Sequence, residues 1–415
     1  MRPGALIAPA ALLACAALAW VAAPALSLRP YMPGATDFKR GLPAAKRLPA
    51  AKARAAANHV EPGEPAPRWT SPSVEAPDRF DLVGVARELR PLQLRVRDHG
   101  GEWSDWVVQE DGTPIWAGGA DEVQVRAAFQ PRGTLYFVNV SGTAGGFADR
   151  LLNSARRSIN SAFIAVASTP VAQALSPKPL VVKRASWGAD LASGGCPPRG
   201  PAEYGGVNAA IVHHTVNANV YTPEEAPGIV LGICRFHVYG NGWNDIGYNA
   251  LVDRYGTVYE GRAGGLKQPV VGAQAQGYNS QTTSIASIGD HTLEPVTPEA
   301  TRSLVRYLSW RLAVGRITPA TGTAQLTSAG GSENRYPAGT VVTVPRIVGH
   351  LTLGLTACPG TLDAQLPAIR TAVQKRIKRY AKSTGKRKCA KRKRKGKKCR
   401  PRRKPGSGGA QVGAR

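Results

Sequence analysis

The sequence predicts an α/β protein: a central sheet flanked by helices, preceded by a small antiparallel β domain and followed by a disordered basic tail. Three observations lead to this fold class. Residues 79–142 alternate apolar and polar side chains with the period of two that is typical of strands. Residues 182–378 alternate strand-like and helix-like runs, which indicates a mostly buried sheet covered by helices. Residues 379–415 are dominated by lysine and arginine.

The first 27 residues are typical of a secretory signal peptide. A positively charged start precedes an apolar run from Ala5 to Leu26, and Ala25-Leu26-Ser27 suits a signal peptidase. Two alternatives remain, namely an uncleaved membrane anchor and lipidation at Cys15, although the sequence stays apolar after that cysteine. We expect an exported protein that is associated with the cell wall.

Two segments are predicted to be linkers. Residues 28–78 are rich in alanine, proline and lysine, and we expect them to form a spacer without a core. Residues 143–181 form a second connector, with a helix near 148–163. Between them, the strands of the β domain are indicated by runs such as Leu92–Val96 and Val123–Ala127. Its tryptophans are interpreted as core or rim residues, with a sugar-stacking face as the alternative; they are Trp103, Trp106 and Trp116.

The region 182–378 contains clear start signals for two helices. Thr222-Pro223-Glu224-Glu225 forms a capping box, and Thr297-Pro298 opens a second helix with an apolar face. A Gly/Ser/Thr-rich stretch at 317–345 predicts a loop or small hairpin. The expected strands are 209–214, 248–253, 258–260 and 284–289.

The basic character of the chain is concentrated in the tail. The net charge is +27, but residues 370–415 contain 21 Lys and Arg and no acidic residue, which leaves +6 for the rest. Such a tail could bind phosphates, yet it lacks interleaved aromatic residues, so we expect it to bind anionic wall polymers or membrane surfaces rather than nucleic acid. The alternative is a solvated tail that only improves solubility.

Three side chains form a candidate zinc site. A strand-like run ends in His213-His214-Thr215, and the stretch from Gly349 to Gly360 contains His350 and Cys358. Two imidazoles and one thiolate leave one tetrahedral position open, which is typical of a catalytic zinc rather than a structural one. Neighbouring strand residues point to opposite faces, so only one of the two adjacent histidines is expected to bind the metal. For Cys358 the alternative is a disulfide.

These residues belong to a series of motifs that resembles the type-2 N-acetylmuramoyl-L-alanine amidase family, which includes peptidoglycan recognition proteins. The matching segments run in order over a little under half of the chain. They are Ser186-Trp187-Gly188, Ile211–Thr215, Gly242–Asn249, Gly256–Arg262, Gly277-Tyr278-Asn279 and Cys358-Pro359-Gly360.

The resemblance implies a mixed sheet flanked by helices and a Zn²⁺ ion held by His213, His350 and Cys358. It implies hydrolysis of the amide between N-acetylmuramic acid and L-alanine in peptidoglycan, since zinc activates water and polarises a carbonyl. Tyr248 and Thr356 are the expected catalytic residues. The alternative is a recognition protein that binds peptidoglycan without cutting it, and a third possibility is that the β domain carries the main function.

The resemblance also suggests substrate contacts, which are Asn279, Arg262 and Gln274. Gln274 stands where many relatives have a histidine, so no second catalytic histidine is expected there. Once a signal peptide and the metal ligand are set aside, the remaining cysteines allow two disulfides: Cys196 with Cys234, and Cys389 with Cys399.

Overall fold

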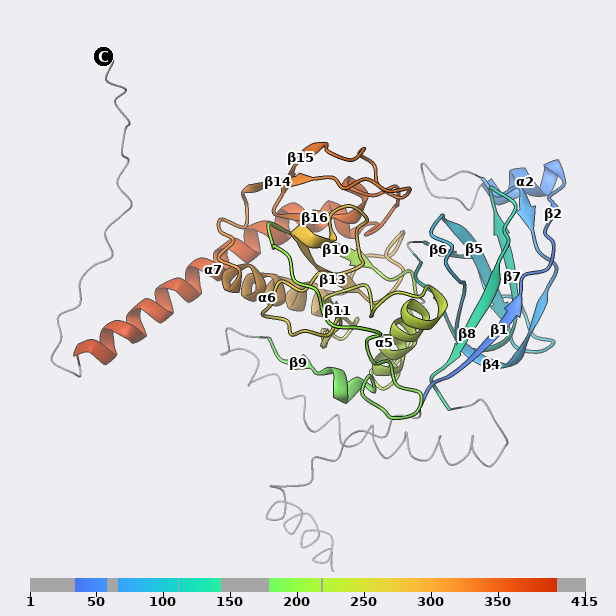
Figure 1. Ribbon diagram of the computed structural model, residues 1–415, viewed down its shortest axis with the longest axis horizontal. Helices are drawn as coiled ribbons and strands as arrows, with labels where there is room; N and C mark the ends of the chain where they lie inside the picture. The colour runs from blue at the N-terminus through green and yellow to red at the C-terminus, as the bar shows by residue number, and fades with distance from the viewer. Residues whose placement is uncertain (1–33, 58–65, 111, 143–178, 218, 394–415) are drawn as a thin grey trace, which may run out of the picture. The chain divides into compact units, whose positions relative to one another are not determined.

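The computed structural model describes residues 34–57, 66–110, 112–142, 179–217 and 219–393, with side chains as far as residue 381 in the last helix (Figure 1). The predicted signal peptide and the helix expected near 148–163 lie outside the described residues. The predicted Cys389–Cys399 pair lies outside the residues whose side chains are described. Within the described ranges, no helix is long and apolar enough to cross a membrane.

The N-terminal domain is an eight-stranded antiparallel sheet. Its main path runs β1-β8-β4-β7-β3-β2, while β5 pairs with β7 and β6 with β5. Apolar side chains on one face, among them Phe80, Leu94 and Phe137, form a core within the domain. The elements are β1 (Thr36–Gly41), β2 (Lys46–Arg47), α2 (Ala50–Ala57), β3 (Trp69–Thr70), β4 (Val74–Val85), β5 (Leu92–Arg97), β6 (Val107–Gln109), β7 (Ile115–Ala127) and β8 (Thr134–Asn139).

The prediction of a spacer at 28–78 was wrong for most of its described residues. Strand β1 pairs with β8 along its whole length, from Thr36 opposite Asn139 to Gly41 opposite Thr134. Strands β2 and β3 and the start of β4 complete the same sheet. Because β1 and β2 lie at the edges of the sheet and most of their side chains are exposed, their polar composition resembles that of a linker.

The tryptophans of the β domain have their faces occupied by protein. Trp116 is buried in the hydrophobic core. The guanidinium of Arg95 lies 4.7 Å from the ring centre of Trp103 and 4.6 Å from that of Trp106, and Arg126 lies 4.2 Å from Trp106. These cation–π contacts favour a rim role over sugar stacking, since the ring faces are covered by arginine.

The second domain contains a six-stranded mixed sheet, as the sequence predicts. Its order is β16-β10-β13-β11-β12-β9, and all pairs are parallel except β11 with β12. The strands are β9 (Val181–Val182), β10 (Ala209–His214), β11 (Ala250–Val252), β12 (Val258–Glu260), β13 (Thr282–Ser287) and β16 (Ile347–Gly349). A separate pair, β14 (Thr323–Thr327) with β15 (Val341–Pro345), is the hairpin expected at 317–345.

Helices cover both faces of this sheet. Helix α5 (Ala226–Arg235), continued by a π-helical turn at Phe236–Gly240, packs on the face that carries Leu251. Helices α6 (Pro298–Val314) and α7 (Leu362–Lys393) pack on the face that carries Ala250 and Val252. The alternation of these neighbouring strand residues between the two cores follows from the strand period of two.

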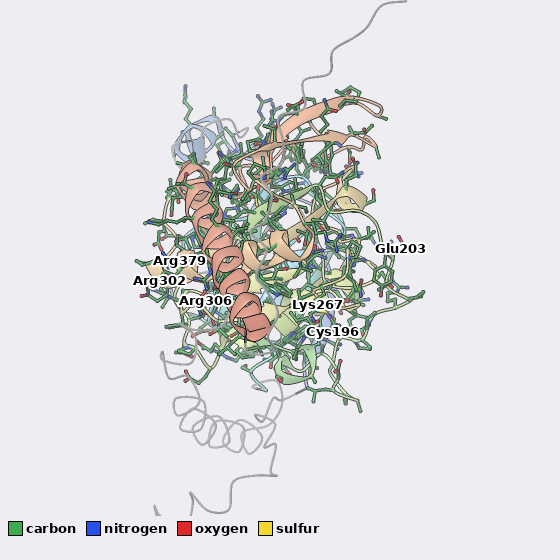
Figure 2. All side chains as sticks on the ribbon, turned by 90° about the vertical axis from the view of Figure 1, so that its left-hand side faces the viewer. Cys196, Glu203, Lys267, Arg302, Arg306 and Arg379 are labelled. Atoms are coloured by element: carbon green, nitrogen blue, oxygen red, sulfur yellow. A yellow bond between two sulfur atoms is a disulfide. The ribbon has the colours of Figure 1, made fainter. Side chains whose placement is uncertain are left out.

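Helix α6 starts as predicted, whereas α5 begins at Ala226 rather than at the predicted Pro223, and its N-cap residue makes no side-chain cap. The hydroxyl of Thr297 accepts a hydrogen bond from the amide of Ala300, and Pro298 occupies the first position of α6. The carboxylate of Glu225 accepts from the amide of Thr222 ahead of α5. By contrast, the predicted tail boundary at 379 was wrong, since α7 extends to Lys393. Figure 2 shows Arg302 and Arg306 of α6 near Arg379 of α7, so a basic surface begins on the folded domain.

The two domains share one hydrophobic core. Leu82 of β4 is fully buried in a cluster that contains Ile229 and Ile233 of α5. The approach is so close that a Cβ atom on Gly232 would lie 2.2 Å from a methyl carbon of Leu82. An ion pair between Arg235 and Asp37 of β1 lies at the same boundary. The β domain is therefore packed onto the second domain rather than tethered to it.

Candidate metal centre and active site

Strand order brings the predicted metal ligands together. His213 is near the end of β10, and β16 runs parallel beside it with Val212 opposite Gly349. His350 follows β16 directly, and its ring centre lies 4.6 Å from that of His213. The ligand atoms of His213, His350 and Cys358 lie within 4.8 Å of one another.

The geometry of this group fits a zinc ion. The sulfur of Cys358 lies 3.6 Å from Nδ1 of His213. A tetrahedral zinc with bonds of about 2.3 Å to sulfur and about 2.0 Å to nitrogen separates two such ligands by roughly 3.5 Å. Burial lowers the pKa of His213 well below its ordinary value, and the neighbouring His350 and His214 lower it further. The imidazole is therefore neutral, which metal binding requires.

Both predicted catalytic side chains lie beside the ligands. The ring centre of Tyr248 is 5.3 Å from that of His213, and only 4% of the residue is exposed. The hydroxyl of Thr356 accepts a hydrogen bond from the amide of Cys358 at 3.0 Å. The structure thus places one phenol and one aliphatic hydroxyl around the candidate metal position.

His214 is closer to the centre than its place on the opposite strand face suggests. Its backbone amide lies 3.4 Å from the sulfur of Cys358. Its ring Nε2 lies 3.1 Å from a carboxylate oxygen of Glu110, and its Nδ1 accepts from the amide of His291 at 3.1 Å. The ring of His214 therefore contacts Glu110 and His291, whereas the ring of His213 faces the other ligands.

Sequence reasoning missed two groups at the site. The first comes from the β domain, where Glu110 and Thr113 contact Thr356 and Tyr248. The second is His237 in the π-helical turn, whose ring lies 5.9 Å from that of Tyr248. Burial lowers the pKa of His237 to about 3, and Arg262 adds to the effect. The sequence Glu110-Asp111-Gly112-Thr113-Pro114 is an ordinary loop signal, so it offered no indication of the first group.

The three predicted substrate contacts each form a hydrogen bond within the fold. The side chain of Asn279 accepts hydrogen bonds from the amides of Gln274 and Ala275, which closes their turn. Gln274 is buried and donates to Thr282, while Arg262 donates to the carbonyl of Ile246. Each side chain thus serves the fold, and its contact with substrate stays a prediction.

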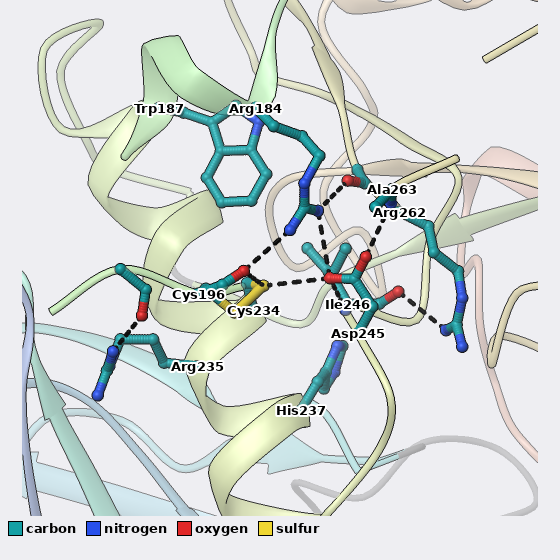
Figure 3. The surroundings of a disulfide bond; sticks show 12 residues. Arg184, Trp187, Cys196, Cys234, Arg235, His237, Asp245, Ile246, Arg262 and Ala263 are labelled. Carbon is teal, nitrogen blue, oxygen red and sulfur yellow. Dashed lines mark hydrogen bonds and ion pairs between the residues drawn. A yellow bond between two sulfur atoms is a disulfide. The ribbon is translucent and has the colours of Figure 1, made fainter. Parts of the chain in front are cut away.

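The predicted pairing of Cys196 with Cys234 is present as a disulfide (Figure 3). Asp245 lies beside it, accepts from the amides of Ile246 and Ala263, and pairs with Arg184 at 3.2 Å. The motif around Asp245 thus anchors the segment that carries Tyr248. Cys358 is not disulfide-bonded within the described residues, which is consistent with a ligand role.

Comparisons with known proteins identify the family of the second domain. A family model described as N-acetylmuramoyl-L-alanine amidase matches residues 203–361. One peptidoglycan-recognition protein of Drosophila simulans is 35% identical over 187 residues, which are 43% of this chain and 81% of the relative. Another from the same species, peptidoglycan-recognition protein SC2, is 29% identical over 182 residues, or 44% of this chain and 80% of the relative.

The chain belongs to the type-2 N-acetylmuramoyl-L-alanine amidase and peptidoglycan recognition protein family. Among solved structures, wild-type Drosophila PGRP-LB overlaps with a TM-score of 0.35 at 25% identity, over 45% of this chain and 92% of that one. The amidase LysC from Clostridium intestinale overlaps with a TM-score of 0.33 at 23% identity, over 47% and 97%. The family match lies entirely in the second domain, which we therefore call the amidase domain.

Proposed function

We propose that this protein is a zinc-dependent N-acetylmuramoyl-L-alanine amidase that hydrolyses the amide between N-acetylmuramic acid and L-alanine in peptidoglycan. The observation that carries the proposal is the complete ligand set, in which one thiolate and two imidazoles converge within 4.8 Å. The relatives are named peptidoglycan-recognition proteins, which supports the same substrate class.

Each side chain of the site has a role in this reaction. Zinc held by His213, His350 and Cys358 would act as a Lewis acid and activate water. Tyr248 and Thr356 carry hydroxyl groups beside the ligands, and we assign them to the negative charge that develops on the carbonyl oxygen. Because the site is buried, such hydrogen bonds are stronger than they would be in water.

We also propose that the protein is exported and retained at the cell wall through its basic end. The basic surface of α6 and α7 supports this, since Arg306 and Arg376 are close enough for their charges to interact. Binding to anionic wall polymers should weaken steeply as salt rises, because exposed charges are screened within about 8 Å at physiological ionic strength.

The decisive test is mass spectrometry of soluble products after purified sacculi are incubated with the wild type, with Cys358→Ser and with a chelated sample. Release of stem peptides with a free L-alanine amino group is expected from the wild type. Loss of an outer partner of a metal ligand already costs about 10–100-fold, so loss of a ligand should abolish detectable release. Leu293→Ala, at a residue that is 84% exposed, serves as the matched control.

The alternative is a recognition protein that binds peptidoglycan without cutting it. It predicts that sacculi are bound normally by the wild type and by Cys358→Ser, with no stem peptide released by either. Zinc content measured on the same samples separates the two functions, since an amidase with this ligand set needs about one zinc per chain.

A further inference from the structure

The metal ligands and Tyr248 of the candidate catalytic centre are buried, whereas Thr356 is partly exposed. His213 and Cys358 are 1% exposed, and His350 and Tyr248 are 4% exposed. Peptidoglycan is a polymer, and its scissile amide must reach both the metal position and the two hydroxyl groups. Something that covers the centre must therefore move before this substrate can bind.

The cover includes a loop of the β domain, between β6 and β7, made of Glu110 and residues 112–114. We call it the Glu110 loop. Glu110 is itself 3% exposed, and its two carboxylate oxygens have different partners. One lies 3.1 Å from Nε2 of His214, and the other accepts a hydrogen bond from the hydroxyl of Thr356 at 2.8 Å.

Thr113 of the same loop forms a hydrogen bond with the second hydroxyl that we assign to the reaction, that of Tyr248. Its Oγ1 lies 3.1 Å from the hydroxyl of Tyr248 and 3.4 Å from Nε2 of His237. Thr113 is 2% exposed, so this contact is sealed from water. The loop thus touches both side chains assigned to the reaction.

The amidase domain holds the backbone of the loop. The side chain of Asn241 donates to the carbonyl of Gly112 at 2.6 Å, and that of Asn217 donates to the carbonyl of Pro114 at 3.0 Å. Gly112 has a φ of 66°, and a Cβ atom there would lie 2.7 Å from the side-chain nitrogen of Asn241. Glycine is therefore required for this close approach.

The chemistry of these contacts opposes catalysis. A threonine hydroxyl has one proton to donate, and Thr356 gives it to Glu110. That proton is then not available to the carbonyl oxygen of a substrate. The carboxylate of Glu110 also places a negative charge beside Cys358, where the reaction develops more negative charge.

Movement of the Glu110 loop alone would leave the core between the two domains intact. The body of the β domain shares a buried core with α5 through Leu82, so separating the domains would expose that core. The loop instead follows Gln109, whose side chain is bonded to both the amide and the carbonyl of Val85. These two hydrogen bonds fix Gln109, and we infer that the residues after it can move as a loop.

We propose that the Glu110 loop is an autoinhibitory plug, which lowers the activity of the amidase centre but does not abolish it, and which must be withdrawn for full activity. The proposal rests on the proposed function, because the plug is defined by the catalytic hydroxyls that it occupies. Withdrawal would free the hydroxyl groups of Thr356 and Tyr248 to contact the substrate and would uncover the metal ligands. Glu110→Ala should therefore open the site, and Glu110→Gln should do so in part, with little change in shape.

The first test does not depend on activity. In the metal-free full-length protein, the alkylation rate of Cys358 by iodoacetamide is followed by mass spectrometry of the peptide that contains it. Each hydrogen bond to a charged group is worth about tenfold or more, so Glu110→Ala should be alkylated at least about tenfold faster than wild type. Glu75→Ala, an exposed carboxylate of β4, is the matched control and should leave the rate unchanged. An equal rate in Glu110→Ala and wild type would refute the plug.

The second test uses release of stem peptides from sacculi by the zinc-loaded proteins. The plug predicts at least about tenfold faster release by Glu110→Ala, with a smaller gain for Glu110→Gln. A loss of activity in both variants would instead make Glu110 part of the catalytic machinery and overturn the proposal.

The two measurements separate the two proposals. Faster alkylation without release from any variant would show that the loop covers Cys358, but it would reject the amidase function and, with it, autoinhibition of that activity. Release by the wild type with unchanged alkylation and unchanged rates in the variants would support the amidase and reject the plug. Thr113→Val, which removes the contact with Tyr248 and keeps the size of the side chain, repeats the comparison if Glu110→Ala does not fold.

Discussion

The shared core predicts that the β domain and the amidase domain unfold together, and Leu82→Ala tests this. Leu82 is fully buried against α5, where Ile229, Gly232 and Ile233 surround it. Replacing a buried leucine by alanine costs about 2–5 kcal/mol, because transfer free energy is lost and a cavity remains. We take about 3 kcal/mol as the expected loss at this well-packed position.

That loss should appear in both domains. At about 1.4 kcal/mol per tenfold, a loss of 3 kcal/mol speeds hydrogen exchange through global unfolding by roughly 150-fold. For a unit of about 300 residues the unfolding entropy is roughly 0.6 kcal/mol per kelvin, so Tm should fall by about 5 °C. Hydrogen exchange with mass spectrometry reports α5 and β4 separately. Leu293→Ala makes the same change at an exposed residue and should cost less than about 0.5 kcal/mol. Unchanged protection of α5 in Leu82→Ala would refute the shared cooperative unit.

Three further predictions concern single side chains. Thr297→Ala removes the N-cap of α6 and should lower the free energy of unfolding by about 1 kcal/mol in urea titrations; no loss would mean that the cap contributes nothing. Burial lowers the pKa of His237 to about 3, so acid protonates the unfolded chain first, and the stability present above pH 6.5 is lost as pH falls toward 3. His237→Gln should therefore lose about 2 kcal/mol less than the wild type between pH 7 and 5, and equal losses would contradict this origin. Cys358→Ser should retain less than a tenth of the zinc of the wild type after dialysis, and full retention would rule out this cysteine as a ligand.

The amidase half could be predicted from sequence because its signals are local. Each of three features can be recognised from a few residues: the apolar strand that contains His213, the capping threonine at 297 and the Cys-Pro-Gly turn. The relation of His213 to His350 then follows from the parallel pairing of β10 with β16. Local pattern and global fold agree here, as expected for minimally frustrated sequences.

The rest could not be predicted, because it depends on contacts between distant segments. Glu110 reaches His214 across 104 residues and Thr356 across 246, and nothing in a turn sequence encodes either partner. Strands β1 and β2 escaped detection for a different reason. Exposed charged side chains on these edge strands oppose pairing with other molecules; they are Lys39, Arg40, Lys46 and Arg47. The same charged residues remove the apolar alternation by which strands are recognised in a sequence.

The position of Asp37 has a consequence for the order in which this chain becomes stable. Its carboxylate accepts from the hydroxyl of Tyr136 at 2.5 Å and from Arg235 at 2.8 Å, 99 and 198 residues further along the chain. Contacts of such long separation carry a large loop-closure cost and form slowly. Strand β1 is therefore among the last elements to be stabilised, because its partner Arg235 lies in the second half of the chain. Trimming of the N-terminus past β1 would consequently loosen helix α5, far away in sequence but adjacent in the fold.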